Sequence, residues 1–289
     1  MDLPPIGAEL ALPPFTLTRP ARQEAPVVLV SAHSGRRYPT EFLQAARLDS
    51  LALRKSEDAF VEELLAAAPE LGLPLLAAEF PRAFCDANRE PWELDPGMFD
   101  TPLPHWVNSA SPRVGAGLGT IARIVASGEP IYRRRLSFEE AERRVRDCWE
   151  PFHAALLALI GETQARFGSC LVLDCHSMPS QALPGMPVPE IVLGDAHGTA
   201  ANPRAVRQVE MSLQRLGFRV RRNDPYAGGY ITRRYGRPRE AVHVVQIELA
   251  RSLYMDEGRI ERSKGFAAMQ ARLTGFLGEM AESDWTMLR

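Results

Sequence analysis

Short apolar runs, rich in valine, leucine and isoleucine, recur along this chain of 289 residues. Most of them are four to seven residues long and end in glycine, serine or a charged residue, which is typical of strands buried in a sheet. We therefore predict strands at residues 27–31, 73–78, 170–173, 190–193, 218–220 and 243–249.

Between these runs, apolar residues recur at intervals of one helical turn. The spacing predicts helices near residues 56–70, after Asn202–Pro203 and from about 260 to 281. A further helix opens at Ser137, because Ser137 and Glu140 form the S-x-x-E pattern of a capping box.

That helix is expected to bend or restart at Pro151. The apolar face predicted for this part of the helix consists of Trp149, Phe152, Leu156, Leu157 and Ile160.

Strands that alternate with helices, without an internal repeat, predict an α/β protein with a mostly parallel sheet. We expect a single domain over residues 1–289, in which residues 1–25 form an extended, proline-punctuated lead-in. Residues 81–130 are rich in proline, and a loop of this length usually carries function. In open α/β sheets, ligands bind at the carboxyl ends of the strands.

Composition excludes several classes of protein. The chain has 34 Lys and Arg against 36 Asp and Glu, so no nucleic-acid or membrane-surface partner is expected. It contains no apolar run of about 18 residues, and Asp2 and Glu9 do not suit a secretory leader. The four cysteines lack a CxxC spacing, so neither a zinc ribbon nor a disulfide framework is predicted. We expect a cytoplasmic protein, and no oligomeric state is indicated.

Three polar residues stand at or near the ends of predicted strands: His33, His176 and Glu248. The strand-end rule would bring them to one edge of the sheet. Two imidazoles with nearby carboxylates suit Zn²⁺, which in hydrolases takes three protein ligands and keeps one position open. The alternative for each histidine is a structural role.

Two carboxylates accompany these histidines. Asp174 precedes His176 by two residues and shares its face of the strand, so it either orients the imidazole or caps the next turn. Glu248 lies in an otherwise apolar strand, where an unpaired carboxylate is costly. Glu248 is therefore either paired with Arg251 or another arginine, or it is a general base acting on water.

Further candidates lie in loops. Asn88 and Arg89 can hold a carboxylate, although such a pair in a loop usually has no function. The glycine-rich turn at residues 224–230 can bring the backbone of Gly229 or the ring of Tyr230 close to a ligand, but it lacks the spacing of a phosphate-binding loop. His197 is a weaker candidate ligand, and His105, His153 and His243 are interpreted as structural.

Taken together, six segments resemble the N-formylglutamate amidohydrolases, over about residues 27–256. They are A-H-S-G from Ala32, S-E-D-A-F-V from Ser56, D-A-N-R from Asp86, L-D-C-H-S from Leu173, Y-A-G-G-Y-I-T-R-R-Y-G from Tyr226 and Q-I-E-L-A-R-S-L-Y-M from Gln246. The resemblance implies kinship with zinc carboxypeptidases and aminoacylases. It also implies their three-layer α/β/α sandwich around a mixed, mainly parallel sheet.

By this resemblance His33 and His176 are zinc ligands, and Glu248 is the catalytic base. The same resemblance implies that Asn88 and Arg89 bind the substrate carboxylate. Carboxypeptidases take their third ligand from a glutamate three residues after the first histidine, where this chain has Arg36. The formylglutamate-type pattern implies Asp58 as that ligand, with Glu57 as the alternative.

The implied reaction hydrolyses a small molecule, N-formyl-L-glutamate, to formate and L-glutamate. Zinc is the expected metal, and another divalent ion is an alternative. Two rival functions are a zinc deacylase or peptidase for another N-acyl amino acid, and a ligand-binding relative without turnover. Because Glu248 has no purpose in a mere binder, its presence favours the enzyme.

Overall fold

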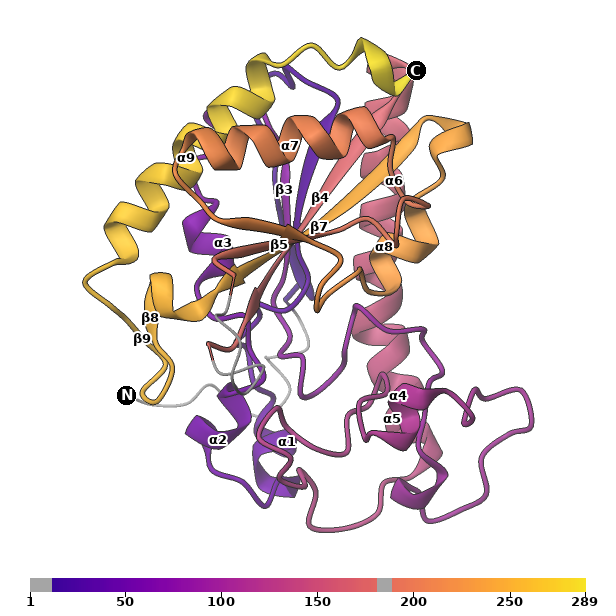
Figure 1. Ribbon diagram of the computed structural model, residues 1–289. Coiled ribbons are helices and arrows are strands. Elements are labelled where there is room, and N and C mark those ends of the chain that lie inside the picture. The colour runs from indigo at the N-terminus through magenta and orange to yellow at the C-terminus, as the bar shows by residue number, and fades with distance from the viewer. Residues whose placement is uncertain (1–11, 181–188) are drawn as a thin grey trace. The chain divides into compact units, whose positions relative to one another are not determined.

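The computed structural model describes residues 12–180 and 189–289 (Figure 1). The chain forms two compact units. Of the described residues, one unit takes in 12–16, 33–57 and 78–154, and the other takes in 17–32, 58–77, 155–180 and 189–289. The expectation of a single domain stays a prediction.

A seven-stranded sheet is the framework of the second unit, with the strand order β1-β3-β2-β4-β7-β5-β6. The pairs β2–β3, β2–β4, β4–β7 and β5–β6 are parallel, whereas β5 runs antiparallel to β7. The sheet is thus mixed and mainly parallel. Its strands are β1 (Phe15–Thr18), β2 (Val27–Ser31), β3 (Leu75–Ala78), β4 (Cys170–Met178), β5 (Ile191–Gly194), β6 (Val220–Arg222) and β7 (Val242–Ala250).

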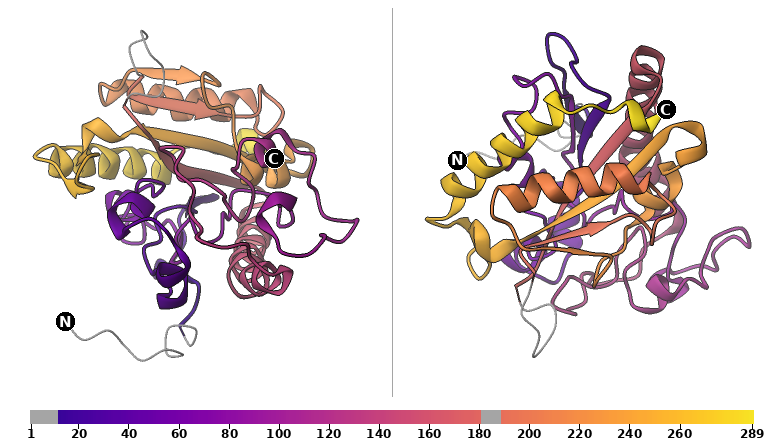
Figure 2. Two further views of the ribbon diagram at one scale, coloured as in Figure 1. Left: turned by 90° about the horizontal axis from the view of Figure 1, so that it is seen from below. Right: turned by 45° about the horizontal axis from the view of Figure 1, so that its top comes forward.

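Helices cover both faces of this sheet, as the α/β/α prediction requires. In Figure 1, α7 lies in front of the strands and α6 runs behind them, and Figure 2 gives the same arrangement from two other sides. Helix α9 packs on both α3 and α7. The helices of this unit are α3 (Val61–Leu64), α6 (Glu150–Phe167, from residue 155 onward), α7 (Pro203–Arg215), α8 (Tyr230–Tyr235) and α9 (Phe266–Glu282).

Alternation along the central strands separates the core from the polar residues. In β4, Leu171, Leu173 and Cys175 belong to the large apolar cluster that includes α3, α7 and α9. Since side chains alternate along a strand, Asp174 and His176 point to the opposite face. Strand β7 repeats this pattern, with Val245, Ile247 and Leu249 in the cluster and Gln246 and Glu248 on the other face.

Several helix predictions need correction. The helix expected over residues 56–70 is only α3, because Phe60 adopts a left-handed backbone (φ 69°) and turns follow Leu64. The last helix begins at Phe266, since the chain before it forms the two-stranded ribbon of β8 (Met255–Asp256) and β9 (Glu261–Arg262).

The predicted apolar face on α6 is correct for Phe152, Leu156 and Ile160, which are buried. It is wrong for Leu157, which is 53% exposed because it lies one position round the helix from Leu156.

The first unit holds short helices and long connections, with a small apolar cluster around Leu94, Phe99 and Ile121. In this unit a 5-residue π-helical segment, Val145–Trp149, separates α5 (Phe138–Arg144) from α6, which begins at Glu150, one residue before the predicted restart at Pro151. The capping box of Ser137 and Glu140 is present. Its helices are α1 (Thr40–Ala45), α2 (Ser50–Arg54), α4 (Pro112–Gly115), α5 (Phe138–Arg144) and a 3₁₀ turn (Pro96–Met98).

No helix in the described part of the chain is both long enough and apolar enough to cross a membrane.

Leu156 and Leu157 offer a matched test of burial on α6. Leu156 is fully buried, so Leu156→Ala should lower the free energy of unfolding by about 2–5 kcal/mol. Leu157→Ala removes the same atoms from an exposed position and should change that free energy by less than about 0.5 kcal/mol. Urea unfolding monitored by circular dichroism measures both, and equal losses would contradict the assignment of the buried face.

Candidate active site

The candidate ligands His33 and His176 come from neighbouring parallel strands. His33 follows the end of β2 by two residues, and His176 lies in β4, whose Asp174 is paired with Val30 of β2. Both imidazoles are 2% exposed. One ligand atom each from His33, Asp58 and His176 lies within 4.8 Å of the other two. Two imidazole nitrogens and one carboxylate oxygen are a donor set that can hold a metal ion.

Two carboxylates hold the His176 ring. Its Nε2 lies 2.9 Å from Asp174 Oδ1 and its Nδ1 lies 2.9 Å from Asp58 Oδ2. Burial lowers the pKa of this imidazole, but Asp174 and Asp58 raise it by more, so the pKa lies well above its ordinary value. Asp174 thus stands where a residue that orients a histidine ligand would stand.

The second carboxylate oxygen of the buried Asp58 is surrounded by hydrogen-bond donors. This oxygen, Oδ1, accepts hydrogen bonds from Ser177 Oγ at 3.1 Å and from Arg251 Nη2 at 3.3 Å, and the contact with Arg251 is also an ion pair. Arg251 also donates through Nε to Ser177 Oγ at 3.0 Å. Arg251, considered above as a partner of Glu248, therefore directs its guanidinium at Asp58 and Ser177, and this contact offsets the cost of burying Asp58.

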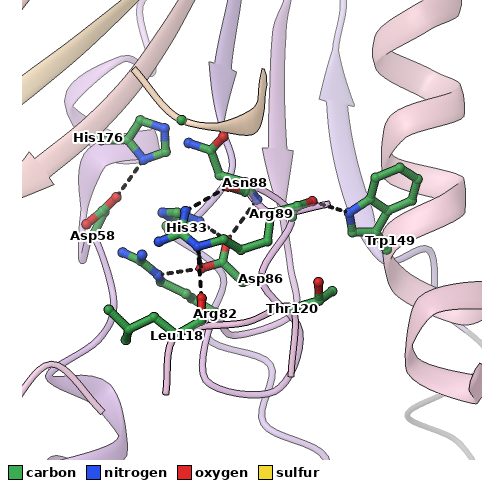
Figure 3. A network of polar contacts seen from close by, with 12 residues as sticks. His33, Asp58, Arg82, Asp86, Asn88, Arg89, Leu118, Thr120, Trp149 and His176 are labelled. Atoms are coloured by element: carbon green, nitrogen blue, oxygen red, sulfur yellow. Dashed lines mark hydrogen bonds and ion pairs between the residues drawn. The ribbon is translucent and has the colours of Figure 1, made fainter. Parts of the chain in front are cut away.

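Asp86 is the corresponding anchor for His33. Figure 3 shows its carboxylate between His33 and two arginines. Oδ1 lies 2.7 Å from His33 Nε2, and Oδ2 accepts from Arg82 Nε at 2.9 Å with Arg89 Nε at 3.8 Å. Burial raises the pKa of Asp86, but Arg89, His33 and Arg82 lower it by more, so it lies well below its usual range. Asp86 is therefore a carboxylate at neutral pH, and it orients the His33 ring.

The D-A-N-R segment that carries Arg89 is fixed by its backbone. The carbonyl of Ala87 accepts from His153 Nε2 at 2.8 Å, and that of Arg89 accepts from Trp149 Nε1 at 3.0 Å. Asp86 Oδ1 accepts from the backbone N–H of Asn88 at 2.8 Å. This segment, a candidate carboxylate clamp, is thus held in one conformation.

The guanidinium of Arg89 is positioned by donation to two backbone carbonyls, from Nε to Leu118 at 3.0 Å and from Nη1 to Asn88 at 2.7 Å. Its side chain is 11% exposed. Burial lowers the pKa of Arg89 to about 10, with Asp86 opposing that shift, so the side chain is positively charged at neutral pH.

Glu248 lies beside His176 in the sheet. The two residues are register partners on the parallel strands β4 and β7, and both point away from the apolar cluster, which places them as neighbours on one face. The Glu248 side chain is buried, and its Oε1 accepts a hydrogen bond from Gln246 Nε2 at 2.7 Å.

The contacts of Asp58 differ from those of Glu57, the alternative ligand. Glu57 accepts from Arg54 Nε at 3.1 Å and from the hydroxyl of Tyr38 at 2.8 Å, whereas Asp58 contacts His176. Burial raises the pKa of Glu57, and Arg54 and Tyr38 only reduce that rise. This placement favours Asp58 as the carboxylate ligand.

The remaining candidates are spread over other positions. Gly229 is buried and its N–H donates to Gln246 Oε1 at 2.7 Å, while Tyr230 next to it is half-buried. His197 is exposed. His243 contacts the backbone of Asn202 and Leu288, in keeping with a structural role.

Sequence reasoning assigned no role to Asp86, Ser177 or Gln246. Gln246 is a polar residue in a buried strand, two positions before Glu248, so the alternation that linked Asp174 to His176 could have found it. Asp86 stands within the D-A-N-R motif, but its contact with His33 joins residues 53 positions apart and has no local signal.

Comparison with known proteins supports the resemblance. A family model described as N-formylglutamate amidohydrolase matches residues 25–255. The chain belongs to the N-formylglutamate amidohydrolase family. The matched segment contains every candidate site residue named above, from His33 to Arg251.

Related proteins of the N-formylglutamate amidohydrolase family resemble almost the whole chain. It is 30% identical over 241 residues to an N-formylglutamate deformylase of Pseudomonas aeruginosa, covering 82% of this chain and 84% of that protein. Against the N-formylglutamate deformylase of Pseudomonas putida the identity is 28% over 238 residues, 80% of this chain and 82% of that one. The crystal structure of an N-formylglutamate amidohydrolase from Ralstonia eutropha JMP134 superposes with a TM-score of 0.88 at 39% identity, covering 94% and 98% of the two chains.

Paired amide substitutions test the choice between Asp58 and Glu57. Asp58→Asn should weaken metal binding by at least about 100-fold, because an amide is a poorer ligand than a carboxylate. Glu57→Gln should leave the affinity within about threefold, since Glu57 is bound to Arg54 and Tyr38. Titration of the metal-stripped proteins with zinc measures both, and the reverse order of effects would make Glu57 the ligand.

Proposed function

We propose that this protein hydrolyses the amide bond of N-formyl-L-glutamate, giving formate and L-glutamate. The observation that carries the proposal is the buried set of His33, Asp58 and His176, whose ligand atoms lie within 4.8 Å of one another. Membership of the N-formylglutamate amidohydrolase family, with deformylases among the relatives, supports this reaction and this substrate.

His33, Asp58 and His176 are the residues that would hold the metal, and zinc suits them because it favours imidazole and carboxylate ligands in hydrolytic sites. The contacts of Asp86 with His33 and of Asp174 with His176 fit this role, since ligand imidazoles usually bond a carboxylate through their second nitrogen. When bound, such an ion polarises the substrate carbonyl and lowers the pKa of water.

Glu248 is the proposed general base. It takes one proton from the attacking water as the new C–O bond forms at the formyl carbon. When the C–N bond breaks, the same proton passes from Glu248 to the leaving amine, so the carboxylate is regenerated and the products are formate and the free amino acid. A buried carboxylate beside His176 suits this task because a general base must be held within hydrogen-bond reach of the proton that it takes.

Arg89 is the proposed partner of a substrate carboxylate, together with the neighbouring Asn88. A guanidinium binds carboxylates through a two-pronged, charge-assisted fork. Because the formyl group is small, selectivity should come mainly from the amino-acid side of the substrate, where a charged contact outweighs a methylene group.

A panel of N-acyl amino acids tests the proposed function. Purified protein loaded with zinc should hydrolyse N-formyl-L-glutamate with the highest kcat/KM, ahead of N-acetyl and N-formimino amino acids and of N-formyl derivatives with neutral side chains. Removal of the metal by a chelator should abolish hydrolysis, and added zinc should restore it. Release of formate and of the free amine measures the rate.

Preference for an acetyl or peptide substrate would replace the proposal with the rival deacylase or peptidase. Binding without turnover of any substrate in the panel would indicate a ligand-binding relative. Full activity after complete metal removal would overturn the proposed metal role.

Glu248→Gln tests the base directly. Removing the carboxylate should lower kcat by about 100- to 10,000-fold, the usual contribution of general acid–base catalysis, with zinc content unchanged. Glu282→Gln, at the exposed end of α9, is the matched control and should keep full activity. Undiminished turnover by Glu248→Gln would exclude Glu248 as the base.

A further inference from the structure

Gln246 lies in the same face of β7 as the proposed base. It is 4% exposed, two residues before Glu248, and paired with Asp174 on β4 and with Gly194 on β5. An uncharged amide at such a depth needs partners for both its ends, because each unpaired polar atom would cost free energy.

The contacts of Gln246 fix which way its amide points. Its Oε1 accepts from the backbone N–H of Gly229 at 2.7 Å, and its Nε2 donates to Glu248 Oε1 at 2.7 Å. A backbone N–H can only donate, so the amide oxygen must face Gly229. The amide nitrogen therefore faces Glu248, where it meets an oxygen that accepts.

The segment that supplies the Gly229 N–H is itself anchored. The carbonyl of Ala227 accepts from the N–H of Ala196 at 2.7 Å. At Gly194 a Cβ would lie 2.7 Å from backbone atoms of both Ala227 and Gly228, so the segment passes directly over the end of β5. This close approach requires glycine at position 194, and it keeps the Gly229 N–H at a set place above Gln246.

From this chain of contacts we infer that Gln246 is a positioning residue for the Glu248 carboxylate. The inference rests on the proposed function, since it assumes that Glu248 is the base. The N–H of Gly229 orients the Gln246 amide, and the amide holds one oxygen of Glu248. The glycine-rich segment 226–229 thereby acts on the base through Gln246.

This role explains why a glutamine stands at position 246, which the fold alone does not require. An apolar residue at position 246 would satisfy the sheet, because the strand bonds are made by the backbone. The glutamine amide supplies both the acceptor for Gly229 and the donor for Glu248, which no apolar side chain can do. A general base works only when its oxygen is held within hydrogen-bond reach of the proton it takes.

Three substitutions in β7 test the inference with the zinc-loaded protein and N-formyl-L-glutamate. Gln246→Met keeps the size and loses both hydrogen bonds. Gln246→Glu keeps an acceptor for Gly229 and loses the donor to Glu248. Val244→Ala, at a fully buried position on the same face, is the control for lost packing.

Both Gln246 variants should lower kcat by about 10- to 100-fold, a part of what the base contributes, with KM within about threefold of wild type. Zinc content should be unchanged in each. Val244→Ala should lower the unfolding midpoint in urea but keep kcat within about twofold. Crystal structures of the metal-free Gln246→Glu protein should show the Glu248 carboxylate moved from its wild-type position.

Wild-type kcat in the Gln246→Glu protein, or an unmoved Glu248 carboxylate in its crystal structure, would overturn the positioning role. So would a fall in kcat that matches a fall in zinc content. A wild-type protein that hydrolyses nothing in the substrate panel would instead overturn the proposed function, and this inference with it.

Discussion

The buried carboxylates of this protein are the constraint on which its candidate site depends. Taking a carboxylate out of water is costly unless opposite charges and hydrogen-bond donors replace the water. Asp58 and Asp86 are both almost fully buried, and each is surrounded by an imidazole and at least one guanidinium. The same contacts therefore offset the cost of burying these carboxylates and hold the histidines and arginines in place.

Each of the two networks can be understood by itself. Asp86 joins His33, Arg82 and Arg89, so one carboxylate orients a candidate metal ligand and stands beside a candidate substrate-binding arginine. Asp58 joins His176, Ser177 and Arg251. In both networks a histidine has a carboxylate on one ring nitrogen, and this contact limits how the imidazole can turn.

Strand alternation is what allows such groups to sit in a sheet that is otherwise apolar. The odd-numbered positions of β4 and β7 build the core with α3, α7 and α9, and the even-numbered ones carry Asp174, His176, Gln246 and Glu248. Because β4 and β7 are parallel and in register, Asp174 is level with Gln246 and His176 with Glu248. A slip of one residue would place the four polar side chains in the core, so packing of the apolar face fixes the register of the polar one.

The sequence by itself predicted strands β2 to β7, although not β1 within the expected lead-in, together with the capping box at Ser137 and the candidates His33, His176 and Glu248. These features have local causes: apolar runs, turn residues, and polar side chains where a strand ends. The local pattern wrongly predicted a continuous helix over residues 56–70, which the left-handed backbone of Phe60 interrupts. It also wrongly predicted that Leu157 is buried, although its side chain points in a different direction from that of its buried neighbour Leu156.

Only the tertiary structure decided which carboxylate stands beside His176. Glu57 and Asp58 are adjacent and chemically alike, and their partners lie elsewhere in the chain: Asp58 is 118 residues from His176. The pairing of Asp86 with His33 and the direction of the Gln246 amide were settled in the same way. Such contacts depend on how distant segments close on one another, and one-dimensional spacing does not encode that geometry.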